Sequence, residues 1–207
     1  MKNLFGEEEK DIIKINKERK IFTTLGASNH TDKERQSGDF YATDPKSLIT
    51  LLNTGIKLNH KIWEPCCGQG HLAETLKQNG YEVKATDIIN RGYGSGGVDF
   101  LYEYDKWDGD ILTNPPYGIA QEIVEHSLSL IPDGNKVVMF FKITFLEGKT
   151  RRKMFEENPP RNIYVFSERQ ICAMNGDFER YGNGSAVCYA WFEWVKGYKG
   201  KPELTWI

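Results

Sequence analysis

The chain has 207 residues, a length that suits one domain with a full hydrophobic core. Its net charge of -2 and its pI of about 6.1 exclude a globally basic nucleic-acid-binding surface, so any such contact must come from a local patch. The N-terminal region is acidic and no apolar run approaches ~20 residues, so we expect neither a signal peptide nor a membrane span. The four cysteines lack C-x-x-C spacing, which predicts free thiols in a cytoplasmic protein and no metal site.

The first regular element is expected after a polar, charge-rich arm at residues 1–38. Asp44 and Pro45 predict a helix start, because Asp caps exposed backbone N–H groups and Pro fits the first helical position. Gly55 is expected to end this helix. Residues 39–207 are therefore predicted to form one domain.

Short apolar runs alternate with amphipathic stretches from residue 61 onward. We expect strands at 61–64, 82–87, 110–113 and 136–141, and helices at 72–78 and 119–130. This alternation predicts an α/β fold with a mostly parallel central sheet and helices on both faces. The late runs 161–166 and 185–194 have no helix between them, so they are expected to pair antiparallel at one edge of the sheet.

A Gly-rich turn follows the expected strand 61–64. Its sequence, Pro65-Cys66-Cys67-Gly68-Gln69-Gly70, leads directly into a helix, and glycine allows a ligand to approach the backbone N–H groups at a helix N-terminus. Asp87 ends the next strand, where it could accept hydrogen bonds from ribose hydroxyls. The pattern predicts an adenosine-containing cofactor and does not separate NAD from S-adenosylmethionine. A tight turn without a ligand is the alternative.

Asp99 and Phe100 form a second candidate cofactor contact. A carboxylate at this position could accept a hydrogen bond from an adenine amine, with the phenyl ring against the face of the base. The alternative is a surface Asp beside a core Phe.

The segment Asn114-Pro115-Pro116-Tyr117 follows the expected strand 110–113 and is the most informative part of the sequence. Two prolines fix the backbone and donate no hydrogen bond, while the side chain of Asn114 adds an acceptor and Tyr117 adds an aromatic face. An aromatic amine is a poor nucleophile, and two rigidly held acceptors for its N–H groups return electron density to the nitrogen. The segment therefore predicts catalysis on a conjugated amine. A rigid turn with Tyr117 in the core is the alternative.

A local concentration of basic residues provides a candidate phosphate-binding patch. Its members are Lys142, Lys149, Arg151, Arg152, Lys153, Arg161 and Arg169. The alternative is a solvated helix face balanced by Glu147, Glu156 and Glu157.

Together, the segments Glu64–Gly70, Asp87 and Asn114–Tyr117 resemble the S-adenosylmethionine-dependent amino-methyltransferase family, which has the Rossmann-like class I methyltransferase fold. The upstream segment Asp39–Pro45 is similar to that family's N-terminal cofactor element. The order of the elements resembles N6-adenine DNA methyltransferases, and the compact form is similar to small phage-borne members. The resemblance covers about residue 39 to the end of the chain.

The resemblance implies S-adenosylmethionine as cofactor and DNA as partner, in a host cytoplasm if the protein is phage-encoded. It implies a cofactor site formed by Tyr41, Thr43, Pro45, Glu64, Pro65, Gly68, Gly70, Asp87, Ile88, Asp99, Phe100 and Asn114. Asn114, Pro115, Pro116 and Tyr117 would hold a target base rotated out of the duplex. Lys142, Lys149, Arg151, Arg152 and Arg169 would contact nucleic acid.

Larger relatives carry a separate target-recognition domain, for which this chain has no room. Recognition would then come from loops, and residues 175–184, with Phe178, Arg180 and Tyr181, are one candidate. RNA adenine or a protein glutamine amide remains an alternative substrate, and a catalytically silent cofactor-binding protein is a further alternative. None of the histidines is expected to be catalytic, although His71 opens a helix beside the Gly-rich turn and could touch the cofactor.

Overall fold

A computed structural model describes residues 41–170, 172–174 and 187–207, with Tyr41 and Cys172–Met174 described by their backbone alone. The predicted arm at 1–38 and the whole candidate recognition loop at 175–184, with Phe178, Arg180 and Tyr181, lie outside these residues. Within the described ranges, no helix is long and apolar enough to cross a membrane. The same residues contain no group of three or more His, Cys, Asp or Glu side chains that could hold a metal ion.

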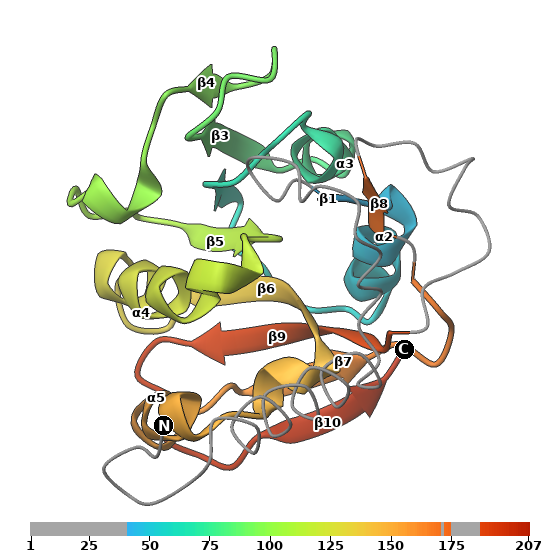
Figure 1. The fold of residues 1–207 in the computed structure, drawn as a ribbon, viewed down its shortest axis with the longest axis vertical. Coiled ribbons are helices and arrows are strands. Elements are labelled where there is room, and N and C mark those ends of the chain that lie inside the picture. The colour runs from blue at the N-terminus through green and yellow to red at the C-terminus, as the bar shows by residue number, and fades with distance from the viewer. Residues whose placement is uncertain (1–40, 171, 175–186) are drawn as a thin grey trace, which may run out of the picture. The chain divides into compact units, whose positions relative to one another are not determined.

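The described part of the chain contains a central sheet of eight strands in the order β10-β7-β9-β6-β5-β2-β3-β4 (Figure 1). In chain order these strands are β2 (Lys61–Glu64), β3 (Glu82–Asp87), β4 (Ser95–Gly96), β5 (Asp110–Thr113), β6 (Lys136–Lys142), β7 (Asn162–Val165), β9 (Tyr189–Val195) and β10 (Glu203–Trp206). Strand β9 runs antiparallel to β6 and β7, and the other neighbouring strands are parallel. The predicted α/β fold is confirmed, as is the antiparallel pairing of the two late strands. Strand β10, which the sequence analysis did not predict, continues the sheet beyond β7.

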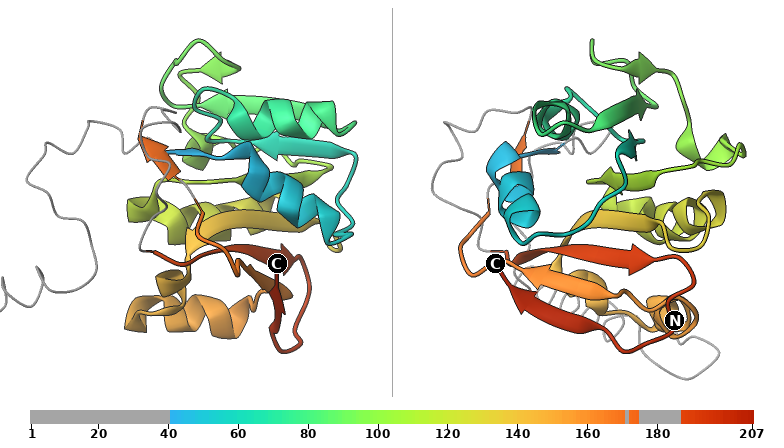
Figure 2. Two further views of the ribbon diagram at one scale, coloured as in Figure 1. Left: turned by 90° about the vertical axis from the view of Figure 1, so that its right-hand side faces the viewer. Right: turned by 180° about the vertical axis from the view of Figure 1, so that it is seen from behind.

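Helices lie on both faces of the sheet, as Figure 1 and the two views of Figure 2 show. The helices are α2 (Pro45–Asn53), α3 (His71–Gln78), α4 (Ala120–Leu130) and α5 (Lys149–Glu157). The described residues also contain three short 3-10 helices. These are η1 (Phe100–Tyr102) between β4 and β5, η2 (Tyr117–Ile119) after β5 and η3 (Ile143–Leu146) after β6. Helices α2 and α3 pack into one hydrophobic cluster, and α4 and α5 pack into the other.

The two clusters follow from the alternation of side chains along each buried strand. In β5, Ile111 belongs to the cluster of α4 and α5, and the next residue, Leu112, belongs to the cluster of α2 and α3. In β6, Val137 and Val138 divide in the same way. Because both faces are covered, these strands are continuous apolar runs rather than alternating polar and apolar patterns.

A second, two-stranded sheet pairs β1 (Tyr41–Thr43) antiparallel with β8 (Cys172–Met174), and Thr43 lies opposite Cys172. Helix α2 begins directly after β1. The carboxylate of Asp44 accepts a hydrogen bond from the backbone N–H of Lys46 at 2.9 Å, and Pro45 occupies the first turn, which confirms the predicted cap. The end of β1 is thereby directly followed by the capped start of α2.

Candidate active site

One pocket joins segments that follow different strands of the parallel part of the sheet. Ligands of open α/β sheets commonly bind at the carboxyl ends of the strands, and the residues after β2, β3 and β5 meet there. The pocket also includes Cys66, Cys67, His71, Ile89 and Arg91. The predicted site residues that line it are Thr43, Glu64, Pro65, Asp87, Ile88, Asp99, Phe100, Asn114, Pro115, Pro116 and Tyr117.

The two glycines of the Gly-rich turn shape the backbone beside this pocket. Gly68 and Gly70 have φ of 54° and 86°, a left-handed conformation that side chains other than glycine rarely adopt. The pocket-lining residues in the described ranges do not include these glycines. A Cβ added to Gly70 would lie 2.5 Å from the ring of Tyr93, so a larger residue does not fit. Both glycines therefore determine the path of the backbone beside the pocket.

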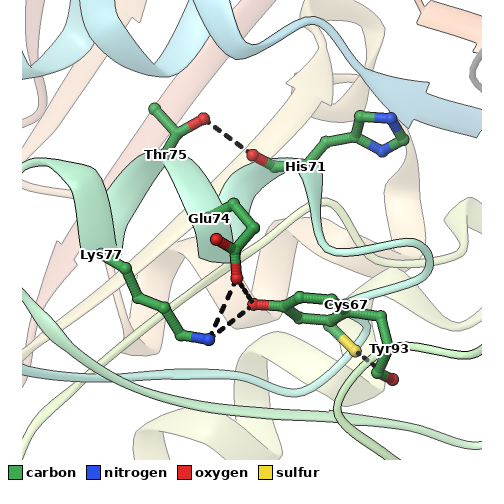
Figure 3. Close-up of polar contacts among 6 residues, drawn as sticks. All are labelled: Cys67, His71, Glu74, Thr75, Lys77 and Tyr93. Carbon is green, nitrogen blue, oxygen red and sulfur yellow. Dashed lines mark hydrogen bonds and ion pairs between the residues drawn. The ribbon is translucent and has the colours of Figure 1, made fainter.

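Tyr93 fastens the loop after β3 to helix α3 (Figure 3). Its hydroxyl donates to Glu74 Oε1 at 2.6 Å and accepts from Lys77 Nζ at 2.9 Å, and Lys77 also pairs with Glu74 at 3.1 Å. The thiol of Cys67 lies 3.8 Å from the carbonyl oxygen of Tyr93. This contact is not predictable from the sequence, because nothing in the local pattern of residues 88–98 indicates that Tyr93 reaches back to α3.

Glu64 is a buried carboxyl in the wall of the pocket, with 2% of its surface exposed. Burial raises its pKa well above the ordinary value of 4.5, a backbone hydrogen bond involving Ala73 opposes this rise, and the nearby charge of Asp87 adds to it. The Oε2 atom has no hydrogen-bond partner among the described residues. A buried acceptor of this kind is costly unless a ligand or water supplies a donor.

Asp87 lies at the end of β3 and is 8% exposed. Its Oδ2 accepts from the backbone N–H of Gly68 and its Oδ1 accepts from that of Ile89, each at 2.8 Å. A carboxylate has about four lone-pair directions, so these two bonds leave it able to accept from a ligand. The next residue, Ile88, lines the pocket and is 59% exposed.

Asp99 and Phe100 combine the two roles considered for them. Asp99 caps η1 by accepting from the backbone N–H of Leu101 at 3.1 Å. Phe100 is buried, and its ring packs edge-on against Trp63 and His126, with centroid distances of 5.1 and 5.0 Å. Both residues nevertheless line the pocket, so a core position and a pocket position coincide here.

The Asn114–Tyr117 segment forms another part of the pocket lining. The side-chain Nδ2 of Asn114 donates to Thr43 Oγ1 at 2.8 Å. The ring of Tyr117 is half-buried, lies 6.4 Å from the ring of Phe141 and has the ammonium group of Lys142 5.2 Å from its centroid. The aromatic face and the amide predicted for a conjugated amine are therefore in one pocket.

Besides Gly68 and Gly70, two residues of the expected cofactor set, Tyr41 and Pro45, are not part of the described pocket lining. Pro45 begins α2 and is absent from the described lining. The side chain of Tyr41 is not described. His71, in contrast, opens α3 and lines the pocket, and its ring points away from the Glu74–Tyr93 contact (Figure 3). Burial lowers the pKa of His71, and the charge of Asp44 partly opposes that effect.

The basic residues divide into several environments. Arg151 is engaged within the fold, because its guanidinium donates to the carbonyl oxygens of Phe145 and Glu147. Arg152 pairs with Glu156 and Lys153 pairs with Glu157, each across one helical turn, and Lys149 and Arg169 are exposed. Lys142 is the member of the patch that lies against Tyr117.

Comparison with known proteins identifies the fold. No protein-family model matches the sequence, and no curated protein does. A solved structure from Listeria monocytogenes, described as a class I S-adenosylmethionine-dependent methyltransferase, aligns with a TM-score of 0.53 at 13% identity over 78% of this chain and 62% of that one.

Two further solved structures are described as parts of restriction systems. The modification subunit of a type I restriction enzyme from Vibrio vulnificus aligns with a TM-score of 0.52 at 11% identity, covering 95% of this chain and 51% of that one. The type IIG restriction endonuclease BpuSI aligns with a TM-score of 0.57 at 14% identity, covering 80% and 27%. This chain thus spans less than two thirds of each of the three structures. The chain has the Rossmann-like fold seen in class I S-adenosylmethionine-dependent methyltransferases.

Proposed function

We propose that this protein transfers a methyl group from S-adenosylmethionine to the exocyclic N6 amine of adenine in DNA. The observation that carries the proposal is that a single pocket is lined both by the acidic ends of β2 and β3 and by the Asn114–Tyr117 segment. The first set suits a cationic, ribose-containing cofactor, and the second suits a flat conjugated amine. The fold is common to class I methyltransferases.

The pocket residues fit S-adenosylmethionine by their chemistry. The unpartnered Oε2 of buried Glu64 provides an acceptor for a donor that the described protein does not supply. Asp87 is able to accept from ribose hydroxyls, and Ile88 presents an exposed apolar surface to the pocket. Asp99 and Phe100 would contact the adenine ring. When bound, the cofactor supplies a methyl group on a positively charged sulfur, and nearby carboxylates favour that charge.

The target amine would be held by the Asn114–Tyr117 segment. The amide oxygen of Asn114 and the carbonyl oxygen of Pro115 are acceptors for the two N–H groups, and Pro115 and Pro116 restrict the backbone that carries them. Tyr117 would stack on the base. These fixed dipoles favour a pyramidal nitrogen whose lone pair is available to react, so the residues act by position and electrostatics.

The order of motifs favours DNA as the substrate, and the ring of Tyr117 favours a flat base over a glutamine amide. Two structures with the same fold are described as a modification subunit of a type I restriction enzyme and as a type IIG restriction endonuclease. In duplex DNA the adenine would have to rotate out of the base stack, at a cost of a few kcal/mol. Lys142 beside Tyr117 is in position to neutralise a phosphate near the rotated base.

A methyl-transfer assay over several substrates tests the proposal. The protein is incubated with methyl-labelled S-adenosylmethionine and, in parallel, duplex DNA, single-stranded DNA, RNA and glutamine-containing protein, and the labelled product is identified by mass spectrometry. We expect N6-methyladenine in DNA, and no label in a duplex that lacks adenine. Label in RNA or in a glutamine side chain would support the same methyl-transfer reaction and show that DNA is the wrong substrate. Donor binding without transfer to any substrate would support a silent binding protein instead.

A further inference from the structure

The side chain of Asn114 is held by a residue that lies 71 positions earlier in the chain. Its Nδ2 donates to the hydroxyl oxygen of Thr43 at 2.8 Å, and Thr43 is 3% exposed. Asn114 is half-buried, so this hydrogen bond between two uncharged side chains is partly shielded from competition with water and can favour one orientation of the amide.

Thr43 is itself fixed from both sides. It is the last residue of β1 and pairs with Cys172 of β8. The next residue, Asp44, caps α2, and its carbonyl oxygen accepts from both the backbone N–H and the hydroxyl of Ser47, at 3.0 and 2.7 Å. Threonine is also branched at Cβ, which restricts its first side-chain torsion. The hydroxyl therefore has a defined position relative to the end of β5.

An amide has two chemically different ends. Its nitrogen only donates hydrogen bonds and its oxygen only accepts them. In the structure Asn114 Nδ2 donates to Thr43, and this arrangement leaves the amide oxygen as the end that can accept from a target amine. A rotation that exchanged the two ends would direct N–H groups at the N–H groups of the amine, and the contact would become repulsive.

We propose that Thr43 is a positioning residue that sets the orientation of the Asn114 amide for methyl transfer. The inference rests on the proposed function, and it differs from the cofactor contact that the sequence predicts for Thr43. A positioning residue changes the rate of the chemical step at saturating donor, whereas a cofactor contact changes the affinity for the donor. The two roles therefore separate in the kinetics.

The chain offers a matched control. On β10, Thr205 Oγ1 accepts from Asn162 Nδ2 at 3.0 Å and lies 3.1 Å from Asn162 Oδ1, so Thr205→Val removes another Thr–Asn side-chain contact. Neither residue is in the described lining of the pocket. Thr43→Val removes the hydroxyl at nearly constant volume, and Thr43→Ser retains it.

The experiment measures kcat, the Kd for S-adenosylmethionine and the thermal midpoint for each variant. We expect Thr43→Val to lower kcat roughly tenfold or more, with donor Kd within about twofold of wild type, because a misplaced catalytic group can cost up to about 100-fold. Thr43→Ser should recover most of the rate, and Thr205→Val should match wild type. In an Asn114→Ala background, Thr43→Val should have no further effect on kcat. A weaker donor Kd with unchanged kcat, or a Ser variant as slow as the Val variant, would overturn the proposal.

A second measurement does not depend on catalysis. With 15N-labelled asparagine, the side-chain NH2 resonances of Asn114 are assigned by their loss in Asn114→Ala. Thr43→Val should shift these resonances and speed their exchange with water, while Thr205→Val leaves them in place. Unchanged Asn114 resonances in Thr43→Val would refute the positioning role even in a protein that methylates DNA. A wild-type protein that methylates nothing would instead refute the proposed function, whatever the spectra show.

Discussion

Asp87 and Gly68 are joined by a hydrogen bond between a carboxylate at the end of β3 and a backbone N–H in the turn after β2. The bond links the expected ribose contact to the Gly-rich turn, so the two features that the sequence presents about 20 residues apart form one structural unit. A substitution at Asp87 therefore alters the turn as well as the proposed ribose contact.

Asp87→Ala should weaken S-adenosylmethionine binding and destabilise the protein. It leaves the N–H groups of Gly68 and Ile89 without their acceptor, which costs about 1–3 kcal/mol for each buried group left unpaired. Asp87→Asn keeps one side-chain oxygen and should lose less stability, while still losing the negative charge. Calorimetric titration and urea denaturation measure the two effects. Donor affinity equal to wild type in both variants would remove Asp87 from the cofactor site.

Asn114→Ala should lower kcat by a factor on the order of 10²–10³, because removal of one preorganised catalytic dipole has an effect of that size. Donor affinity should stay within a few-fold of wild type. Asn114→Asp retains acceptor oxygens and loses the donor to Thr43, so its rate should fall between those of wild type and Asn114→Ala. Single-turnover assays at saturating donor give these rates. Methyl transfer by Asn114→Ala at the wild-type rate would contradict the catalytic assignment.

Gly70→Ala should destabilise the fold more than Gly80→Ala. Both glycines have positive φ, 86° and 88°, so both substitutions carry a conformational cost of about 1–2 kcal/mol. Only at Gly70 does the added Cβ meet another group, the ring of Tyr93 at 2.5 Å, whereas nothing lies within 4 Å at Gly80. The steric conflict should add about 1–3 kcal/mol. Equal losses of unfolding free energy in the two variants would show that the Tyr93 ring does not confine Gly70.

Glu64→Gln should make the ligand-free protein more stable at neutral pH and weaken its affinity for S-adenosylmethionine. Because the folded-state pKa of Glu64 is raised, its contribution to stability is fully present below 4.5 and is lost as pH rises through the folded pKa. Glutamine does not ionise, so the decline of unfolding free energy with pH should be smaller in the variant.

Glu193→Gln is the control for the pocket. Burial also raises the pKa of Glu193, but this residue bonds to Tyr164 on a neighbouring strand and does not line the pocket as described. It should alter the pH dependence of stability and leave donor affinity unchanged. Denaturation between pH 5 and pH 8, with donor titrations at each pH, separates the two carboxyls. If Glu64→Gln binds the donor as wild type does, the Glu64 carboxylate is not a cofactor contact.

The strands next to the pocket were predictable because their apolar runs are short and bounded by turn chemistry. Lys61–Glu64, Glu82–Asp87 and Asp110–Thr113 have the predicted limits. Strand β10 was missed because Glu203–Trp206 is short and largely exposed, although its polar and apolar residues alternate. Strands β1 and β8 have three residues each, and they become recognisable only when segments about 130 positions apart meet.

The contacts between site residues were harder to predict than their membership of the pocket. The residue types of Asn114 and Thr43 suggest polar contacts, but their hydrogen bond depends on how β1 lies against the end of β5. Likewise, the basic residues after β6 suggest a phosphate patch, and only the fold shows that Arg151 is held by backbone carbonyls. Local sequence determines which groups are available, and tertiary packing determines which of them meet.

The fastening of Tyr93 to Glu74 and Lys77 has a thermodynamic consequence for ligand binding. The loop that carries Ile88, Ile89 and Arg91 into the pocket is tied at its far side to a helix, by groups that do not line the pocket in the described structure. These contacts restrict the loop during folding, before a ligand is present. Less association free energy is therefore needed to order this wall of the pocket when a ligand binds. Binding to an ordered wall is expected to be tighter and faster than binding to a loop that must fold around its ligand.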